Sequence, residues 1–332
     1  MHEFHTVPSR SDVVFLKDYA VDQAELYKLY ENAKRDQWNA SKDVPWEQPV
    51  DASRGLLADE LVDAFGTDHW RRLSREQQAE LNRRLATWRL STLMYGEHGA
   101  MLVCSQLVEM VEGNDAKRFQ ATQVVDEARH TEVLNRYIAE KLGGHFYPMP
   151  AALKELFDVL LSDSRWAAKA IGLQLVAETF AVSLFRMLAE TSRDPLLSEI
   201  CRRILADESR HMGFGMLSLP RVVAESSETQ RLELEEVTEW AVVKTLKGVF
   251  PYEPYREMGF TEDEIDDVRR QKRERQAGGD AVVFRQIFRK ELDSTLLANL
   301  ARVGLLNERS RERLAAVGVR TPPRSPAVSS LR

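Results

Sequence analysis

The sequence predicts an all-α protein built around a core of four long helices. Glycine and proline are few, 16 and 12 among 332 residues. They fall mainly between segments in which apolar residues recur at helical spacing. Four such segments occupy residues 75–113, 115–143, 151–192 and 195–219, and strand-like alternation is weak throughout. These observations favour a helical bundle over any sheet-containing fold.

Turn residues place the limits of these segments. We expect a first helix at about residues 18–39, followed by a connector that contains two prolines. The joints of the core are expected at residues 112–115, at residues 143–150, at residues 163–164 as a break within the third segment, at residues 194–195 and at Pro220.

The chain continues well beyond the four core segments. Further helices are expected at residues 228–248, 262–275, 280–304 and 307–317. We therefore expect one domain over residues 1–320, with its core at about 75–220 and additional helices at about 225–318, and a disordered tail at residues 321–332.

Composition narrows the class of protein. Forty-six Lys and Arg residues against 52 Asp and Glu residues give a formal charge of -6, and no basic block suggests nucleic acid as a partner. The only cysteines, Cys104 and Cys201, are far apart in sequence, which favours buried thiols in a reducing compartment over a disulfide scaffold. We find no secretion signal and no run of 18 apolar residues, so we expect a cytoplasmic protein without a membrane span.

Two near-identical pentapeptides, DEARH at residues 126–130 and DESRH at residues 207–211, carry the chemistry. Each is preceded by another glutamate at the same distance, because Glu97 lies 30 residues before Glu127 (127 − 97) and Glu178 lies 30 residues before Glu208 (208 − 178). The sequence therefore contains two helix pairs in matching register, and each pair supplies Glu followed by Glu-x-x-His.

These glutamates lie within the apolar stripes of their helices. Glu97, for example, shares a face with Leu93, Ala100 and Cys104. A buried unpaired carboxylate costs several kcal/mol, and bound metal removes that cost. Because Glu and His at positions i and i+3 share a helix face, both side chains can reach one ion. The predicted ligands are Glu97, Glu127, His130, Glu178, Glu208 and His211.

The composition of this ligand set indicates the metal. Four carboxylates carry a charge that two divalent cations neutralise, and one imidazole per ion suits iron or manganese better than zinc. Two glutamates plus two Glu-x-x-His motifs on four helices is the known pattern of di-iron and di-manganese bundles. We expect two Fe ions, with an Mn/Fe pair as the alternative.

At these residues the sequence resembles the ferritin-like superfamily, in the branch of ribonucleotide reductase small subunits, bacterial di-iron monooxygenases and acyl desaturases. The resemblance covers roughly residues 20–220 and includes the stretch at residues 33–46. It implies a ferritin-like four-helix bundle with extra N- and C-terminal helices. It also implies that Asp126 and Asp207 support the ligand histidines of the opposite pair.

Three positions depart from individual groups of this branch. Leu134 stands where a reductase subunit carries its radical-storing tyrosine, and Val182 stands where monooxygenases usually carry threonine. The arylamine N-oxygenase group adds a third histidine one turn before the last glutamate, but position 204 is isoleucine. These departures leave the family within the branch open.

The resemblance implies an O2-activating di-iron oxygenase or oxidase. Its reaction would be hydroxylation, N-oxygenation or desaturation of a small or carrier-bound organic substrate. The electrons would come from an external reductase or ferredoxin, because the chain has no G-x-G-x-x-G dinucleotide motif. A homodimer is compatible with the sequence. The alternatives are a ferroxidase or metal-storage protein, and a subunit of a larger complex that retains its metals.

Overall fold

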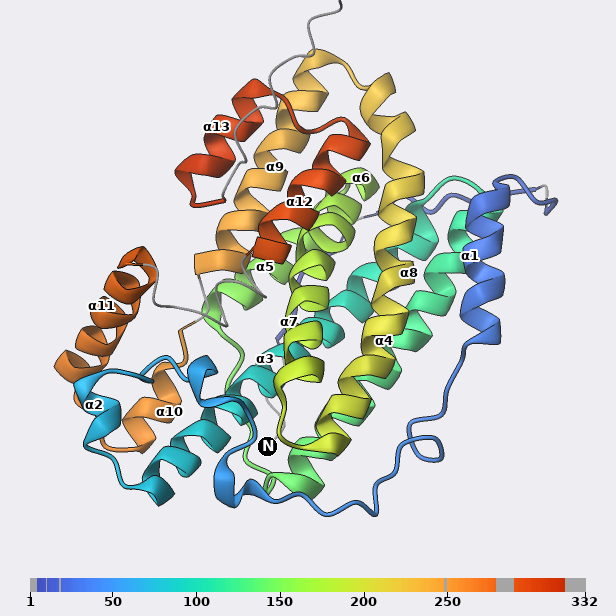
Figure 1. The fold of residues 1–332 in the computed structure, drawn as a ribbon. Coiled ribbons are helices and arrows are strands. Elements are labelled where there is room, and N and C mark those ends of the chain that lie inside the picture. The colour runs from blue at the N-terminus through green and yellow to red at the C-terminus, as the bar shows by residue number, and fades with distance from the viewer. Residues whose placement is uncertain (1–4, 10, 18, 248–249, 279–289, 320–332) are drawn as a thin grey trace, which may run out of the picture.

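The computed structural model describes residues 5–9, 11–17, 19–247, 250–278 and 290–319, and within them the fold is all-α (Figure 1). Extended pairing among these residues is limited to one isolated bridge between Leu57 and Ser192. The α-helices are α1 Ala24–Arg35, α2 Asp68–Arg71, α3 Arg75–Met110, α4 Asn114–Lys141, α5 Ala151–Ser162, α6 Trp166–Ala170, α7 Glu178–Thr191, α8 Pro195–Glu225, α9 Glu228–Lys247, α10 Tyr252–Glu257, α11 Glu262–Gly278, α12 Lys290–Val303 and α13 Glu308–Ala316.

The core is a bundle of two helix pairs, α3 with α4 and α7 with α8. Helix α1 packs along α4 and α8. Helix α9 packs against α5 and α6, and α12 packs against α7 and α8. A capping box formed by Ser74 and Gln77 begins α3, and the carboxylate of Asp194 caps α8 one residue before Pro195. These caps fix the first residues of α3 and α8, the helices that carry Glu97 and Glu208.

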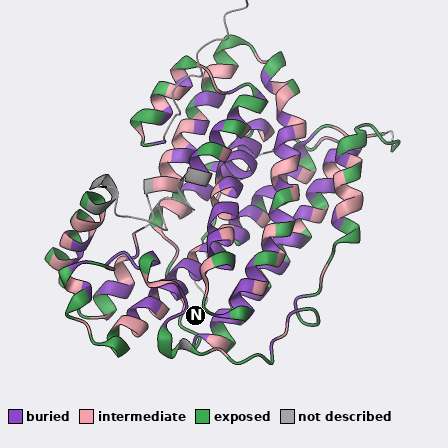
Figure 2. Cartoon of the chain, viewed as in Figure 1, coloured by how far each residue is buried: buried purple, intermediate pink, exposed green. Residues whose placement is uncertain are grey.

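Two apolar clusters fill the bundle, one towards each end of it. Figure 2 shows the buried residues gathered along the core helices, with exposed residues on the outer helices. On α3, Leu93 belongs to one cluster and Ala100 to the other. On α8, Ile204 and Phe214 are divided in the same way. A charged layer that includes Glu97 and Glu208 therefore lies between the two apolar clusters.

The third core segment is interrupted, as expected, near residues 163–164. Helix α5 ends at Ser162, α6 begins at Trp166, and a π-helix follows over Ile171–Ala177. No pattern in the sequence predicts this π-helix. The π-helix lies directly before Glu178, one of the predicted ligands. Turns of this kind widen the helix and often occur at functional sites.

One predicted helix end is wrong. The fourth core helix continues through Pro220 to Glu225. Proline removes one intrahelical hydrogen bond. The turns on either side are nevertheless held in place, because Leu219 and Val223 are both buried in the core. The first helix is also shorter than expected, at Ala24–Arg35. The start of the helix predicted at residues 280–304, and the tail at residues 321–332, lie outside the described residues.

The segment Trp166–Thr191 is long and apolar enough to span a membrane, judged by length and composition alone. Within the structure, however, 78% of its most apolar window is buried. It also carries Glu178 into the centre of the bundle. The apolar character of this segment therefore matches that of a central core helix.

Candidate metal centre

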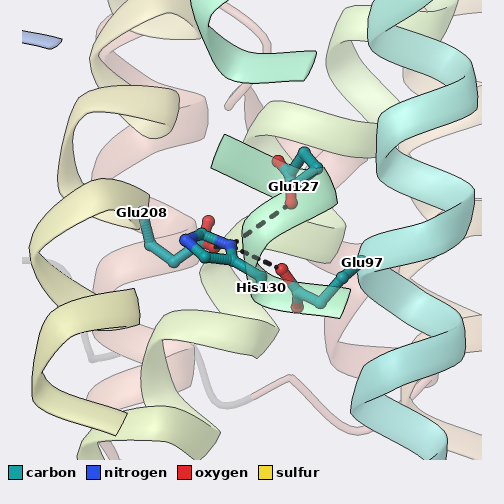
Figure 3. Close-up of side chains that lie close together, drawn as sticks. All are labelled: Glu97, Glu127, His130 and Glu208. Carbon is teal, nitrogen blue, oxygen red and sulfur yellow. Dashed lines mark hydrogen bonds and ion pairs between the residues drawn. The ribbon is translucent and has the colours of Figure 1, made fainter. Parts of the chain in front are cut away.

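The structure brings the six predicted ligand side chains together in the charged layer. Glu97 comes from α3, Glu127 and His130 from α4, Glu178 from α7, and Glu208 and His211 from α8. All six are at most 4% exposed. Figure 3 shows Glu97, Glu127 and Glu208 gathered around the ring of His130.

These residues form two overlapping groups. Within each group the candidate ligand atoms all lie within 4.8 Å of one another. One group is Glu97, Glu127, His130 and Glu208, and the other is Glu127, Glu178, Glu208 and His211. The carboxylates of Glu127 and Glu208 belong to both groups, which is the arrangement that two adjacent ions with shared carboxylates require.

Each histidine presents one ring nitrogen to the glutamates and the other to an aspartate. Nδ1 of His130 lies 3.0 Å from Oε2 of Glu97, and its Nε2 lies 3.0 Å from Oδ2 of Asp207. Nδ1 of His211 lies 3.0 Å from Oε2 of Glu208, and its Nε2 lies 3.2 Å from Oδ2 of Asp126. Because a carboxylate only accepts, an Nε2–H that donates to the aspartate leaves the lone pair of Nδ1 facing the glutamates. Each aspartate contacts the histidine of the opposite pair.

The two aspartates are themselves held by cations and by the N-terminal segment. Arg129 donates to both Asp126 and Asp207, at 2.6 and 2.8 Å, and Arg210 donates to Asp207. Nε1 of Trp38 donates to Asp207 at 2.8 Å. The side-chain amide of Gln37 donates to Asp126 at 2.9 Å. This network joins segments far apart in the chain, and no pattern in the sequence predicts it.

The charge balance of the layer leaves the glutamates uncompensated. Two arginines face the two aspartates, so the four glutamates lack fixed counter-charges of their own among the described residues. Burial, together with the neighbouring charge of Glu208, raises the pKa of Glu97 and of Glu178 well above the usual range. Burial alone would lower the pKa of His211, but the charges of Glu208 and Glu127 and hydrogen bonds to carboxylates raise it to about 10. Without metal, protons must therefore neutralise the cluster.

Two further observations fit a bound metal. Oε2 of Glu127 and Oε1 of Glu208 are buried and accept no hydrogen bond from the described residues. They lie 3.5 and 3.1 Å from Nδ1 of His130, and they belong to the two carboxylates that the groups share. Buried polar atoms without a hydrogen bond are rare and call for an explanation such as an ion. Oxygen-rich sites with one imidazole per ion suit iron and manganese.

A cluster of glutamine amides adjoins the glutamates. Nε2 of Gln123 donates to Glu127 Oε1 at 3.0 Å and to Glu178 Oε1 at 3.1 Å. Gln174 in turn donates to Oε1 of Gln123 at 2.8 Å. The sequence analysis missed these residues. Their signal was present, because each glutamine lies one helical turn before a predicted ligand, at positions 127 − 4 and 178 − 4, on an otherwise apolar face.

Other features of the sequence are explained by packing. Cys104 and Cys201 are both free and fully buried, and burial raises the pKa of each thiol. Tyr137 is also buried, and its hydroxyl donates to Asp194, which lies at the helix cap. Leu134, at the position of the reductase tyrosine, is buried in the apolar core.

A cavity of about 370 Å³ reaches the metal centre. Its walls include Glu97 and Glu178, the only two of the six candidate ligands that line it. Much of the remaining wall is apolar and includes Leu93, Phe180 and Leu184. The volume lies in the range of small-molecule binding sites.

A buried carboxylate–histidine cluster inside a four-helix bundle defines a class, that of the non-haem dinuclear metal proteins. The model of the p-aminobenzoate N-oxygenase AurF family matches residues 20–305. The chain belongs to this family and is a non-haem di-iron oxidoreductase with the ferritin-like helical fold. This resolves the choice that the sequence analysis left open, although the residue at position 204 is isoleucine.

Solved structures similar to this chain include variants of R2-like ligand-binding oxidases. One, with an aerobically reconstituted Mn/Fe cofactor, is 17% identical over 85% of this chain and 94% of its own, with a TM-score of 0.49. Another, with an anaerobically reconstituted Mn/Fe cofactor, is 18% identical over 85% of this chain and 94% of its own, with a TM-score of 0.48. The comparison with curated proteins gave no match.

Proposed function

We propose that the six residues Glu97, Glu127, His130, Glu178, Glu208 and His211 hold two iron ions per chain. Glu127 and Glu208 would help to hold both ions, because each belongs to both groups of candidate ligands. Asp126 and Asp207 would orient the histidines through their Nε2 atoms. An Mn/Fe pair would use the same ligands.

We further propose that the protein is an O2-dependent oxygenase acting on a small or carrier-bound organic substrate. The observation that supports this function is the cavity of about 370 Å³ that adjoins Glu97 and Glu178. Hydroxylation or N-oxygenation consumes one O2, two electrons and two protons, and releases water with the oxidised product. The electrons would come from an external reductase or ferredoxin.

The residues of the chain have separable tasks in this reaction. Bound iron supplies the site at which dioxygen is activated. The apolar wall formed by Leu93, Phe180 and Leu184 excludes water and orients the substrate beside Glu97 and Glu178. Asp207 keeps the proton on Nε2 of His130, so that Nδ1 stays free to act as a ligand.

Stoichiometry and oxygen consumption together test the proposal. Protein loaded with Fe(II) under anaerobic conditions should bind about two ions per chain, as two ligand groups imply. On mixing with O2 it should react once, and it should turn over only with an electron donor and an organic substrate. A storage protein would instead continue to oxidise and retain added Fe(II). A subunit that keeps metal only for stability would not react with O2.

The substrate is sought with isotopically labelled dioxygen. Oxygen incorporation into an arylamine, a hydrocarbon chain or a carrier-bound acyl group would distinguish the candidate reactions. Failure of every candidate under conditions in which the reduced protein consumes O2 would overturn the oxygenase proposal and favour an oxidase.

A further inference from the structure

The wall of the cavity beside the metal centre combines three chemically different sets of side chains. The carboxylates of Glu97 and Glu178 form part of it. Apolar side chains come from three helices and include Leu93 of α3, Leu184 of α7 and Leu246 of α9. Five cationic residues also line the cavity, namely Arg89, Lys244, Arg269, Lys272 and Arg273.

Most of these cations already have an acidic partner. Lys244 pairs with Glu155 at 2.6 Å and Arg269 pairs with Asp266 at 3.0 Å. Lys272 pairs with Asp63. These three charges are locally neutralised, and Arg273 is exposed to solvent. These four cations therefore leave little driving force to bind an anion inside the cavity.

Arg89 differs from the other cations. It is only 8% exposed, yet no described carboxylate lies within 4.0 Å of its guanidinium. Its Nη2 donates to the carbonyl oxygen of Leu61 at 2.6 Å. Its Nη1 is buried and has no hydrogen-bond partner among the described residues. A buried guanidinium without a counter-ion is costly, and a ligand anion would remove that cost.

The spacing along α3 sets the length of a ligand that could reach from Arg89 to Glu97. Arg89 precedes Glu97 by eight residues (97 − 89), which corresponds to about 12 Å along the helix axis. Standard bond geometry converts this distance to roughly ten bonds of an extended chain. A single aromatic ring is too short for this span. A benzene-sized cavity also needs only about 150 Å³, whereas this cavity has about 370 Å³.

We propose that the cavity binds an elongated apolar monocarboxylate, whose anionic end pairs with Arg89 and whose far end lies beside Glu97 and Glu178. This assignment rests on the proposed function of the metal centre and names the substrate class. A monoanion is favoured because Arg89 is buried on the wall and no carboxylate of the described residues lies within ion-pair distance of it. A carboxylate matches it because guanidinium groups bind carboxylates through charge-assisted hydrogen bonds.

Binding calorimetry on the Fe(II)-loaded protein without O2 tests the assignment. The probes are decanoate, uncharged 1-decanol and benzoate. Decanoate should bind most tightly, with one molecule per chain. Arg89→Gln should weaken decanoate binding by about 10- to 100-fold, the effect of losing a hydrogen bond to a charged group. It should leave 1-decanol binding unchanged.

Two variants serve as controls. Arg83→Gln removes another arginine of α3, one that pairs with Glu80, and it should not change any affinity. Ala181→Phe fills the cavity wall and should block decanoate and 1-decanol alike. Should Arg89→Gln fail to fold, Arg89→Lys retains the charge and should retain most of the preference for decanoate over 1-decanol.

Several outcomes would overturn the assignment. These are equal binding of decanoate and 1-decanol, benzoate binding as tightly as decanoate, or unchanged decanoate affinity in folded Arg89→Gln. Because no O2 is present, these results are independent of the oxygen chemistry. If the reduced protein does not react with O2 but decanoate binding depends on Arg89, the proposed function fails while the ligand class stands.

Discussion

Replacing Asp207 by asparagine tests the support of the metal centre most directly. Oδ2 of Asp207 accepts hydrogen bonds from Trp38, Arg129 and His130, and its Oδ1 accepts one from Arg210. Asparagine keeps the shape of the side chain but has one accepting oxygen. Whichever way the amide is placed, its NH2 group faces at least one donor.

The size of the effect follows from the burial of this network. Asp207 is 1% exposed and lies between two guanidinium groups. Removing one partner of a buried ion pair costs about 3–5 kcal/mol. We therefore expect the free energy of unfolding of the metal-free protein to fall by about that amount. Loss of the carboxylate charge beside His130 should also weaken metal binding by about 10- to 100-fold.

Urea unfolding and anaerobic Fe(II) titration measure the two effects separately. Asp68→Asn is the matched control, because its carboxylate is 81% exposed and pairs with Arg71 at the surface, away from the network of Asp207. That change should cost less than about 1 kcal/mol and leave iron affinity unaltered. If Asp207→Asn behaves like this control in both assays, the supporting role of Asp207 has to be abandoned.

Three further predictions concern the ligands, the glutamine cluster and a buried lysine. Glu127→Ala or Glu208→Ala should abolish two-metal occupancy, because each of these carboxylates belongs to both ligand groups. Glu97 belongs to one group, so Glu97→Ala should still bind one ion. Metal analysis that finds equal losses in all three variants would contradict the shared roles of Glu127 and Glu208. Gln123→Leu should weaken iron binding by about 10- to 100-fold while leaving the fold intact, and unchanged Fe(II) titration curves would remove Gln123 from the support of Glu127. Burial lowers the pKa of Lys169 from its ordinary 10.5 to about 8. Between pH 8 and 10.5 the unfolded chain therefore holds one more proton than the folded chain. The free energy of unfolding should rise with pH over this range by up to about 3 kcal/mol relative to Lys169→Met. Parallel stability curves for the two proteins between pH 8 and 10.5, measured by urea unfolding, would refute the last point.

Much of the fold could be predicted because helical periodicity is a local property. The limits of α3 and α4 follow closely from turn residues and from the apolar stripes. The helix end predicted at Pro220 was wrong for a tertiary reason. Proline weakens a helix only locally, and burial of Leu219 and Val223 keeps the chain helical beyond it. The π-helix before Glu178 likewise has no pattern in the sequence that predicts it.

The sequence by itself determined which residues form the candidate centre. Glu and His at positions i and i+3 must share a helix face, and two matching copies place four carboxylates and two imidazoles inside one bundle. Chain-local spacing was sufficient for this inference because each motif lies within a single helix.

Only the tertiary structure decided what surrounds these residues. The contacts of Trp38 with Asp207 and of Gln123 with Glu178 join helices or loops whose approach depends on packing across the bundle. The same is true of the sharing of Glu127 and Glu208 between two ligand groups. The buried guanidinium of Arg89, which has no acidic partner among the described residues, is likewise a property of the assembled cavity wall, because the local sequence does not show which charges find partners.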